Sequence, residues 1–375
     1  ILPEALMLEV ADIFRLHGAV YRERFGDRLL PSQKRAMQDI EACRTAYFGG
    51  HLKQCDRCGH QVYTYHSCRN RHCPKCHRHQ TDRWLAKQRA RLLPCRYFLV
   101  TITLPSELRP LARAHPKKLY SLLPRSAAAA LQKLALDPRY LGARLGCVAV
   151  LHTWTRAMLY HPHVHLLVTA GGLSADGTRW IDSKYSNYLV PAEALAIIFR
   201  AKLCAALRKA KLLSQTSPQV WEKSWVVDCK AAGSGRKVLQ YLGRYLFRIA
   251  IANSRLEQID HDQVTFRYRE SRTQKLRRLT LPALEFIARF LQHVLPPGST
   301  KVRYYGIWSN SCRKQREQAR ALLSASPAPA SDPAPSLVVA PEPAASTSSP
   351  AHCPHCRLGQ LIVIEVLLPQ KRFPP

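Results

Sequence analysis

The chain has 375 residues, 46% of them hydrophobic, which is enough for two or three domains with a buried core and excludes a wholly disordered protein. Lys and Arg total 57 against 25 acidic residues, and the formal net charge of +32 indicates a polyanionic partner, with nucleic acid the first candidate. A membrane surface would also attract this charge, but no apolar run reaches the ~18 residues of a spanning helix, so no membrane association is expected.

The first fifty residues read as a helical N-terminal segment, 1–50. Apolar residues recur at helical spacing from Leu2 to Leu16 and again from Met37 to Cys43. Residues 1–12 contain three acidic residues and lack the basic start and apolar run of a secretory signal. A cytoplasmic location is therefore expected.

Residues 51–93 concentrate Cys and His and contain few aliphatic residues, which is typical of a small module held together by metal. Cys55 and Cys58 form one C-x-x-C pair and Cys73 and Cys76 form another, so we predict that these four thiolates hold one structural zinc ion. The 13 cysteines would give ~0.5 such pairs at random, whereas three are present. Reduced thiols without metal are the alternative. Four further residues of this module leave the ligand set open: Cys68, His72, His77 and His79.

Basic residues surround the cysteine pairs and continue into a helix predicted over residues 78–93. Arg69, Arg71 and Lys75 belong to this group, and residues 69–91 contain a single acid, Asp82. Such a surface could dock DNA through its phosphates, so residues 51–93 are predicted to be a zinc-binding, DNA-docking module. A solvated helix face without a partner is the alternative.

Residues 94–323 mix short β-rich apolar runs with helical segments, which predicts an α+β domain with a mostly antiparallel sheet. The strands are expected over residues 96–104, 145–154, 163–172, 225–229, 263–269 and 301–307. The helices are expected over residues 192–213, 237–252 and 283–295.

Two histidines of the third predicted strand, His163 and His165, are candidate ligands of a divalent cation. They stand two residues apart, so their side chains leave the same face of the strand. His152 ends the preceding apolar run, and a neighbouring antiparallel strand could bring it to the same face as a third ligand. The pair alone is a weak signal, because 16 histidines produce ~0.7 such pairs by chance. Histidines that simply pack in the fold are the alternative.

Two tyrosines in a predicted helix, Tyr241 and Tyr245, are candidate nucleophiles. A spacing of four places both on one helix face, and the basic residues near them, Arg244, Arg248 and Arg255, favour a phosphate close by. A bound cation would polarise a phosphodiester and help to remove the proton of a phenol whose ordinary pKa is about 10. Attack by tyrosine would store the bond energy in a phosphotyrosine. A packing stripe of tyrosines is the alternative.

The C-terminal part begins with an Ala/Ser/Pro-rich stretch, residues 324–351, whose composition predicts a disordered linker. Residues 352–375 contain the third C-x-x-C pair, Cys353 and Cys356, followed by a short apolar run. They are interpreted as a small appended ribbon or hairpin that supplies half of a possible additional zinc site.

The cysteine module, followed by HPHVH and then by YLGRY, resembles the two-tyrosine HUH rolling-circle transposases of the insertion-sequence-ninety-one family over roughly residues 51–306. The resemblance implies an HUH endonuclease fold, in which a compact antiparallel sheet follows an N-terminal zinc-binding module. It implies that His163 and His165 bind Mg²⁺ or Mn²⁺ and that Tyr241 and Tyr245 are the two nucleophiles. His152 looks like the third histidine of related conjugative relaxases.

The same resemblance implies a rolling-circle transposase that cuts single-stranded DNA at element ends and joins it to a target through 5′-phosphotyrosine intermediates. Imidazole ligands suit Mn²⁺ better than Mg²⁺, so both ions stay candidates beside structural Zn²⁺. Two alternative functions remain: a plasmid replication initiator or relaxase with the same chemistry, and a non-catalytic zinc-ribbon protein that binds DNA.

Overall fold

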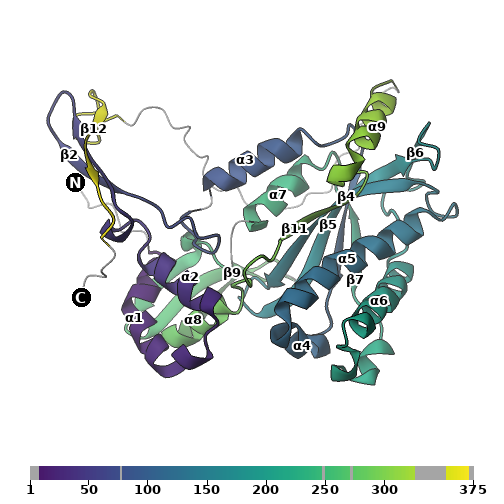
Figure 1. Ribbon diagram of the computed structural model, residues 1–375, viewed down its shortest axis with the longest axis horizontal. Helices are drawn as coiled ribbons and strands as arrows, with labels where there is room; N and C mark the ends of the chain where they lie inside the picture. The colour runs from purple at the N-terminus through teal and green to yellow at the C-terminus, as the bar shows by residue number, and fades with distance from the viewer. Residues whose placement is uncertain (1–7, 77, 247–249, 271–272, 326–351, 371–375) are drawn as a thin grey trace. The chain divides into compact units, whose positions relative to one another are not determined.

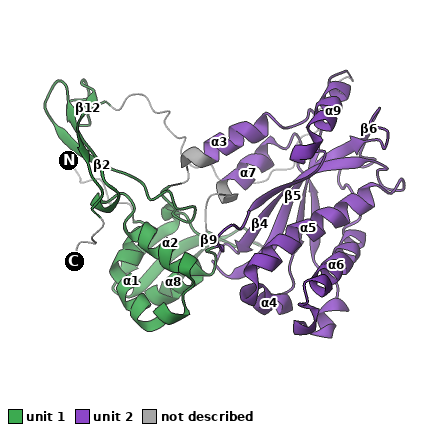
Figure 2. Ribbon diagram, viewed as in Figure 1, with its two compact units in different colours: residues 1–79, 247–294, 338–375 green, residues 80–246, 295–337 purple. Residues whose placement is uncertain are grey.

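The computed structural model of the chain describes residues 8–76, 78–246, 250–270, 273–325 and 352–370, without the side chains of residues 78–80, 241 and 244–246. The chain forms two compact units (Figure 2). Unit 1 comprises residues 1–79, 247–294 and 338–375, and unit 2 comprises residues 80–246 and 295–337. Among the described residues, no helix has the length and apolar character needed to cross a membrane.

Unit 2 is built on a six-stranded sheet with the order β11-β4-β5-β3-β7, in which β6 pairs with β5. Every pairing in it is antiparallel, so the predicted α+β class with an antiparallel sheet is confirmed. The strands are β3 (Tyr97–Thr103), β4 (Arg144–Trp154), β5 (Tyr160–Leu173), β6 (Trp180–Asp182), β7 (Val227–Ala231) and β11 (Val302–Gly306).

Helices cover both faces of this sheet (Figure 1). Alternate strand residues such as Val100, Leu151 and Val164 point to one face, where they form a core with the apolar sides of α5 and α6. On the opposite face α7 packs against β4, and its Val238 and Leu242 are fully buried. The helices are α3 (Arg78–Arg89), α4 (Arg109–Ala114), α5 (Pro116–Ala135), α6 (Ala192–Lys209), α7 (Arg236–Leu246) and α9 (Arg313–Ala325).

Some predicted helices are shorter in the structure. The helix expected over residues 192–213 ends at Lys209, because Lys211 adopts a left-handed φ of 57°. The helix expected over residues 237–252 is described as far as Leu246, and Ala250 has a φ of 51°, so it does not continue the helix. The longest described helix of unit 2, α5, was not predicted, although its alanine-rich centre has high helix propensity.

Unit 1 contains α1 (Val10–Phe25), α2 (Pro31–Glu41), α8 (Ala283–Leu291) and the three-stranded sheet β10-β9-β8. The strands of this sheet are β8 (Leu256–Asp260), β9 (Gln263–Arg269) and β10 (Leu276–Pro282). Phe14 of α1 packs edge-on against Phe290 of α8 with ring centroids 5.3 Å apart, and Gln33 donates a hydrogen bond of 2.9 Å to the carbonyl of Leu291. The predicted domain over residues 94–323 is divided between the two units, because residues 250–270 and 273–294 group with the N-terminal helices in unit 1.

A second sheet of unit 1 joins the two halves of the chain in the order β12-β1-β2, with β1 (Gly50–Cys55), β2 (Gln61–Tyr65) and β12 (Leu361–Leu367). The C-terminal apolar run does not form the small appended ribbon or hairpin that its sequence predicts. It instead pairs antiparallel with β1, about three hundred residues earlier in the chain. Of the predicted linker, residues 324–325 end α9 and residues 326–351 lie outside the described residues.

Short 3₁₀ helices connect these elements, over Gly26–Arg28, Ala46–Phe48, Ser106–Leu108, Leu213–Gln215, Pro218–Trp221, Asn253–Arg255 and Asn310–Cys312.

Candidate active site and cysteine clusters

Three histidines meet on one face of the sheet in unit 2. In the antiparallel pairing of β4 with β5, His152 lies directly opposite His163, and His165 follows two residues later on the same face. The ring centroids are separated by 4.7 to 5.3 Å. One nitrogen of each imidazole lies within 4.8 Å of the other two, so this trio can surround one cation. The structure thus brings together the three residues that the sequence pattern grouped.

Burial keeps these imidazoles neutral. Desolvation lowers the pKa of His163 to about 4, and it holds the pKa values of His152 and His165 well below their ordinary range. A neutral imidazole offers the nitrogen lone pair that a metal ion needs.

Hydrogen bonds orient two of the rings. Nδ1 of His163 donates to the carbonyl oxygen of His161 at 2.7 Å, which leaves Nε2 as the nitrogen with an available lone pair. Nδ1 of His165 is 2.9 Å from the hydroxyl oxygen of Thr101, which lies directly opposite it on β3. Sequence reasoning missed Thr101. Its signal is the alternation of threonine with apolar residues in the run VTIT, which marks one face of β3 as polar.

We predict that Thr101→Val weakens Mn²⁺ binding to the histidine trio by about tenfold, because valine keeps the shape of threonine but cannot hold the His165 ring by a hydrogen bond. Isothermal titration calorimetry with Mn²⁺ measures this change. Thr280→Val, on β10 of unit 1, is the matched control and should leave Mn²⁺ affinity unchanged. Equal affinities of the Thr101 variant and the unchanged protein would show that the hydrogen bond does not position the ligand.

The trio fits a divalent transition ion better than Mg²⁺. Imidazole nitrogens suit first-row transition ions, and Mn²⁺ accepts them more readily than Mg²⁺, which prefers oxygen ligands in an octahedron. His161 lies outside the trio, and its Nδ1 accepts a hydrogen bond of 2.8 Å from the guanidinium of Arg109. Lys301 lies near the trio. Its ammonium is 5.2 Å from the ring centroid of Trp154, and the Trp154 ring stacks on His152.

The predicted nucleophiles, Tyr241 and Tyr245, both belong to α7, the helix on the same face of the sheet as the histidines. Tyr97 and Thr101 are four residues apart on β3, so their side chains leave the same face of the sheet. Gly235, just before α7, lies against that face, because a Cβ on it would be 2.9 Å from the Tyr97 ring. The helix also approaches α3 closely, since a Cβ at Gly243 would lie 2.7 Å from Leu85. The side chains of Tyr241 and Tyr245 lie outside the described residues, so their role stays a prediction.

The residues predicted to contact DNA differ in their exposure and in the partners that they already have in the structure. Arg69 is exposed. Burial lowers the pKa of Arg71, and the ammonium of Lys75 forms an ion pair with Glu9, so neither is a simple exposed cation. Arg255 donates a hydrogen bond of 2.8 Å to the carbonyl of Arg267 and lies over the ring of Phe266, which indicates a structural role. The side chain of Arg244 and all of Arg248 lie outside the described residues.

The cysteines form two clusters in unit 1, not one. In the first, Sγ of Cys76 lies 3.4 Å from Sγ of Cys43 and 3.4 Å from Sγ of Cys68, and Cys73 completes the group. Hydrogen bonds from these neighbouring thiols lower the pKa of Cys76, as expected where one thiolate is shared by several thiols. Sequence reasoning missed Cys43, which has no C-x-x-C partner.

The second cluster combines Cys55 and Cys58 with the C-terminal pair. Sγ of Cys55 lies 3.6 Å from Sγ of Cys356, and Sγ of Cys58 lies 3.6 Å from Sγ of Cys353. The backbone N–H of Gly359 donates to Cys356 and lowers the pKa of that thiol to about 6.

The structure does not bring Cys55, Cys58, Cys73 and Cys76 together as the predicted single site, but divides them between the two clusters. Each C-x-x-C pair has the geometry of half a site, but pairing of β1 with β2 and β12 places the first pair beside the C-terminal one. His72 belongs to neither cluster, since its Nδ1 faces the side-chain oxygen of Asn70 at 3.1 Å.

We predict that Cys43→Ser removes one bound zinc ion per chain and lowers the melting temperature of unit 1, because a hydroxyl is a much weaker zinc ligand than a thiolate. Zinc is measured by inductively coupled plasma mass spectrometry after dialysis. Cys204→Ser, on α6 of unit 2, should keep the zinc content of the unchanged protein. Full zinc content in the Cys43 variant would exclude this residue as a ligand.

Two family profiles match the chain. One described as "Transposase zinc-binding domain" matches residues 13–104, which include the first cysteine cluster. One described as "Putative transposase" matches residues 146–316, which include the histidine trio and α7. The matched zinc-binding domain and the two four-cysteine clusters together support structural zinc. No solved structure matches the chain.

Two curated relatives are similar over most of their length. "Putative transposase y4qJ" of Sinorhizobium fredii is 41% identical, over 96% of this chain and 95% of the relative. The transposase for insertion sequence element IS801 of Pseudomonas savastanoi pv. phaseolicola is 30% identical, over 72% of this chain and 68% of the relative. The two profiles on this chain and its similarity to these two transposases show that the protein belongs to the insertion-sequence-ninety-one family of transposases.

Proposed function

We propose that this transposase nicks and joins single-stranded DNA at the ends of its insertion sequence through tyrosine, as an HUH endonuclease. The observation that carries the proposal is the trio of His152, His163 and His165, whose nitrogens converge on the sheet face that α7 covers. Membership of a transposase family supports DNA as the partner. The net charge of +32 supports a polyanion as the ligand.

The trio would hold one Mn²⁺ or Mg²⁺ ion, which would polarise the scissile phosphate and stabilise the charge on its oxygens. The phenol oxygen of Tyr241 or Tyr245 attacks phosphorus and loses its proton to solvent. The bond from phosphorus to the 3′ oxygen breaks, so that strand ends in a free 3′ hydroxyl, and the 5′ end stays on the tyrosine. The 3′ hydroxyl of another strand then reverses the reaction and releases the tyrosine. Because the phosphodiester energy is conserved, no external energy source is needed.

The exposed side of α3 supplies a path for the DNA backbone. Leu85 and Gln88 are buried, whereas Arg83, Lys87 and Arg89 are exposed. This helix packs against α7, so its cations lie in the same unit as the histidine trio. We infer that these three residues contact phosphates of the strand that is cut.

The proposal is tested with labelled single-stranded oligonucleotides from the ends of the insertion sequence. With Mn²⁺ the protein should release a product with a 3′ hydroxyl, and with excess chelator it should still bind the oligonucleotide but cut none. A double-stranded oligonucleotide of the same sequence is the control and should remain intact. Absence of cleavage on every end sequence, with binding retained, would refute the nuclease proposal.

A further inference from the structure

The second cysteine cluster is made of two turns, and in each turn backbone N–H groups donate to the sulfur of one cysteine. In the first turn, the backbone N–H groups of Arg57 and Cys58 donate to Sγ of Cys55 at 3.4 and 3.5 Å. In the C-terminal turn, the N–H of Gly359 donates to Sγ of Cys356 at 3.4 Å. Backbone donors of this kind stabilise a thiolate, which is the form that binds metal. Both turns are therefore prepared for metal ligation.

The two turns also contact each other directly. The N–H of Gln360 donates to the carboxylate of Asp56 at 2.8 Å, and the N–H of Asp56 donates to the carbonyl of Gln360 at 3.1 Å. The rings of His60 and His355 stack with centroids 5.2 Å apart. Gly359 permits this approach, because a Cβ at that position would lie 2.4 Å from Sγ of Cys55.

Side-chain packing contributes little to holding the adjacent strand, β12. Ile362, Val363 and Val366 are 51%, 52% and 62% exposed, although all three are apolar. The strand is an edge strand of the three-stranded sheet and, among the described strands, pairs only with β1, through its backbone. An edge strand whose apolar side chains stay in solvent gains little stability from packing. An additional interaction at the end of β12 is needed to account for its pairing with β1.

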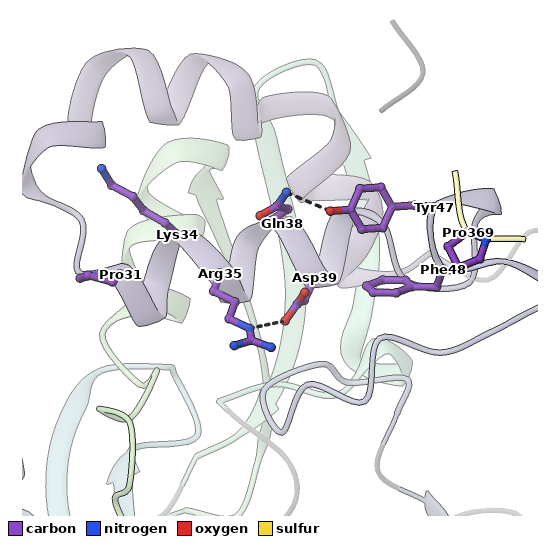
Figure 3. Close-up of a pocket in the computed structure, with 8 residues that line it drawn as sticks. All are labelled: Pro31, Lys34, Arg35, Gln38, Asp39, Tyr47, Phe48 and Pro369. Carbon is purple, nitrogen blue, oxygen red and sulfur yellow. Dashed lines mark hydrogen bonds and ion pairs between the residues drawn. The ribbon is translucent and has the colours of Figure 1, made fainter. Parts of the chain in front are cut away.

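Beyond β12 the tail continues along unit 1. The N–H of Gln370 donates to the carbonyl of Ala46 at 3.0 Å. Pro369 lies beside Phe48 at the edge of a pocket of ≈ 680 Å³ (Figure 3). The tail is therefore anchored at both ends of β12, by the cysteine cluster at one end and by the 3₁₀ helix Ala46–Phe48 at the other.

We propose that Cys55, Cys58, Cys353 and Cys356 bind one zinc ion, separate from the ion of the first cluster, and that this ion fastens the C-terminal strand to the N-terminal sheet. Their sulfurs lie within 4.8 Å of one another, and four thiolates form a closed structural site. Zinc replaces the thiol protons, which pass to solvent. The C-terminal half of the site lies beyond both matched ranges, residues 13–104 and 146–316, so neither family profile accounts for it.

The first test counts four-cysteine sites by cobalt substitution, because the cobalt–thiolate absorbance comes from the cysteine clusters and not from the histidine trio. Full-length protein with Cys353→Ser and Cys356→Ser should lose half of this absorbance, and one zinc ion per chain. Cys68→Ser, in the first cluster, should cause a similar loss. Cys204→Ser is the matched control, with no loss expected. Undiminished absorbance in the double variant would overturn the proposed site.

The second test follows the strand itself by hydrogen exchange of the full-length protein. Zinc removal, or the double variant, should raise exchange at residues 361–367 by at least tenfold and leave β4 and β5 of unit 2 protected. The Cys68→Ser variant should lose the zinc ion of the first cluster yet retain protection at residues 361–367. Unchanged protection of β12 in the zinc-free double variant would overturn the fastening role. Protected β4 and β5 would show that the variant has not simply unfolded.

Discussion

Replacing Tyr241 and Tyr245 together by phenylalanine is expected to reduce cleavage of single-stranded DNA by at least ~10³-fold, because removal of a catalytic nucleophile leaves only binding and electrostatic effects. The substitution deletes the two phenol oxygens and keeps the rings, so the fold of α7 should persist. Cleavage is measured in single-turnover reactions with Mn²⁺. Oligonucleotide affinity, measured separately, should change by less than about threefold.

The single variants show whether the two tyrosines attack different DNA strands. If each nucleophile serves a different strand, Tyr241→Phe and Tyr245→Phe should each retain cleavage but lose joining. Tyr63→Phe, on the exposed strand β2, is the control and should behave like the unchanged protein. Near-normal cleavage by the double variant would reject both residues as nucleophiles.

Replacing His163 and His165 together by alanine is expected to abolish Mn²⁺ binding at the trio and to reduce cleavage by at least ~10²-fold. With His152 alone, a divalent ion would lose two of three protein ligands and its orientation toward the phosphate. Titration calorimetry measures the affinity for Mn²⁺, and the oligonucleotide assay measures the rate of DNA cleavage. Because the rings are largely buried, circular dichroism should first confirm that the sheet is retained.

The histidine prediction has a control in His261, a surface residue of unit 1 whose side chain is 95% exposed. His261→Ala should preserve both Mn²⁺ affinity and cleavage. Full activity of the double variant at saturating Mn²⁺ would show that the trio is not the catalytic metal site. Loss of activity with unchanged Mn²⁺ binding would place the metal elsewhere.

The histidine trio could be predicted because it depends on short-range regularities. A two-residue repeat puts His163 and His165 on one face, and the antiparallel neighbour that carries His152 near its end is joined to their strand by a short connection. Thr101 was missed because the strand that carries it is more than sixty residues away, and the sequence does not say which strands are neighbours. Register between distant strands is set by the packing of the whole sheet.

The cysteine partners could not be predicted for the same reason. A C-x-x-C pair specifies half of a metal site, but which halves meet depends on the pairing of β1 with β12. Cys43 carries no local signal, since it is a single cysteine at the end of a helical segment. The grouping of residues 247–294 with the N-terminal helices is also invisible locally, because the apolar face of α8 would suit any helix of complementary shape.

The most direct test of the proposed mechanism is the chemical identity of the protein–DNA bond. Unchanged protein is incubated with a single-stranded element end and Mn²⁺, digested with protease and nuclease, and sequenced by mass spectrometry. We predict a nucleotide attached through its 5′ phosphate to the phenol oxygen of Tyr241 or Tyr245. A nucleotide attached to another residue, or cleavage without any covalent adduct, would contradict the tyrosine mechanism.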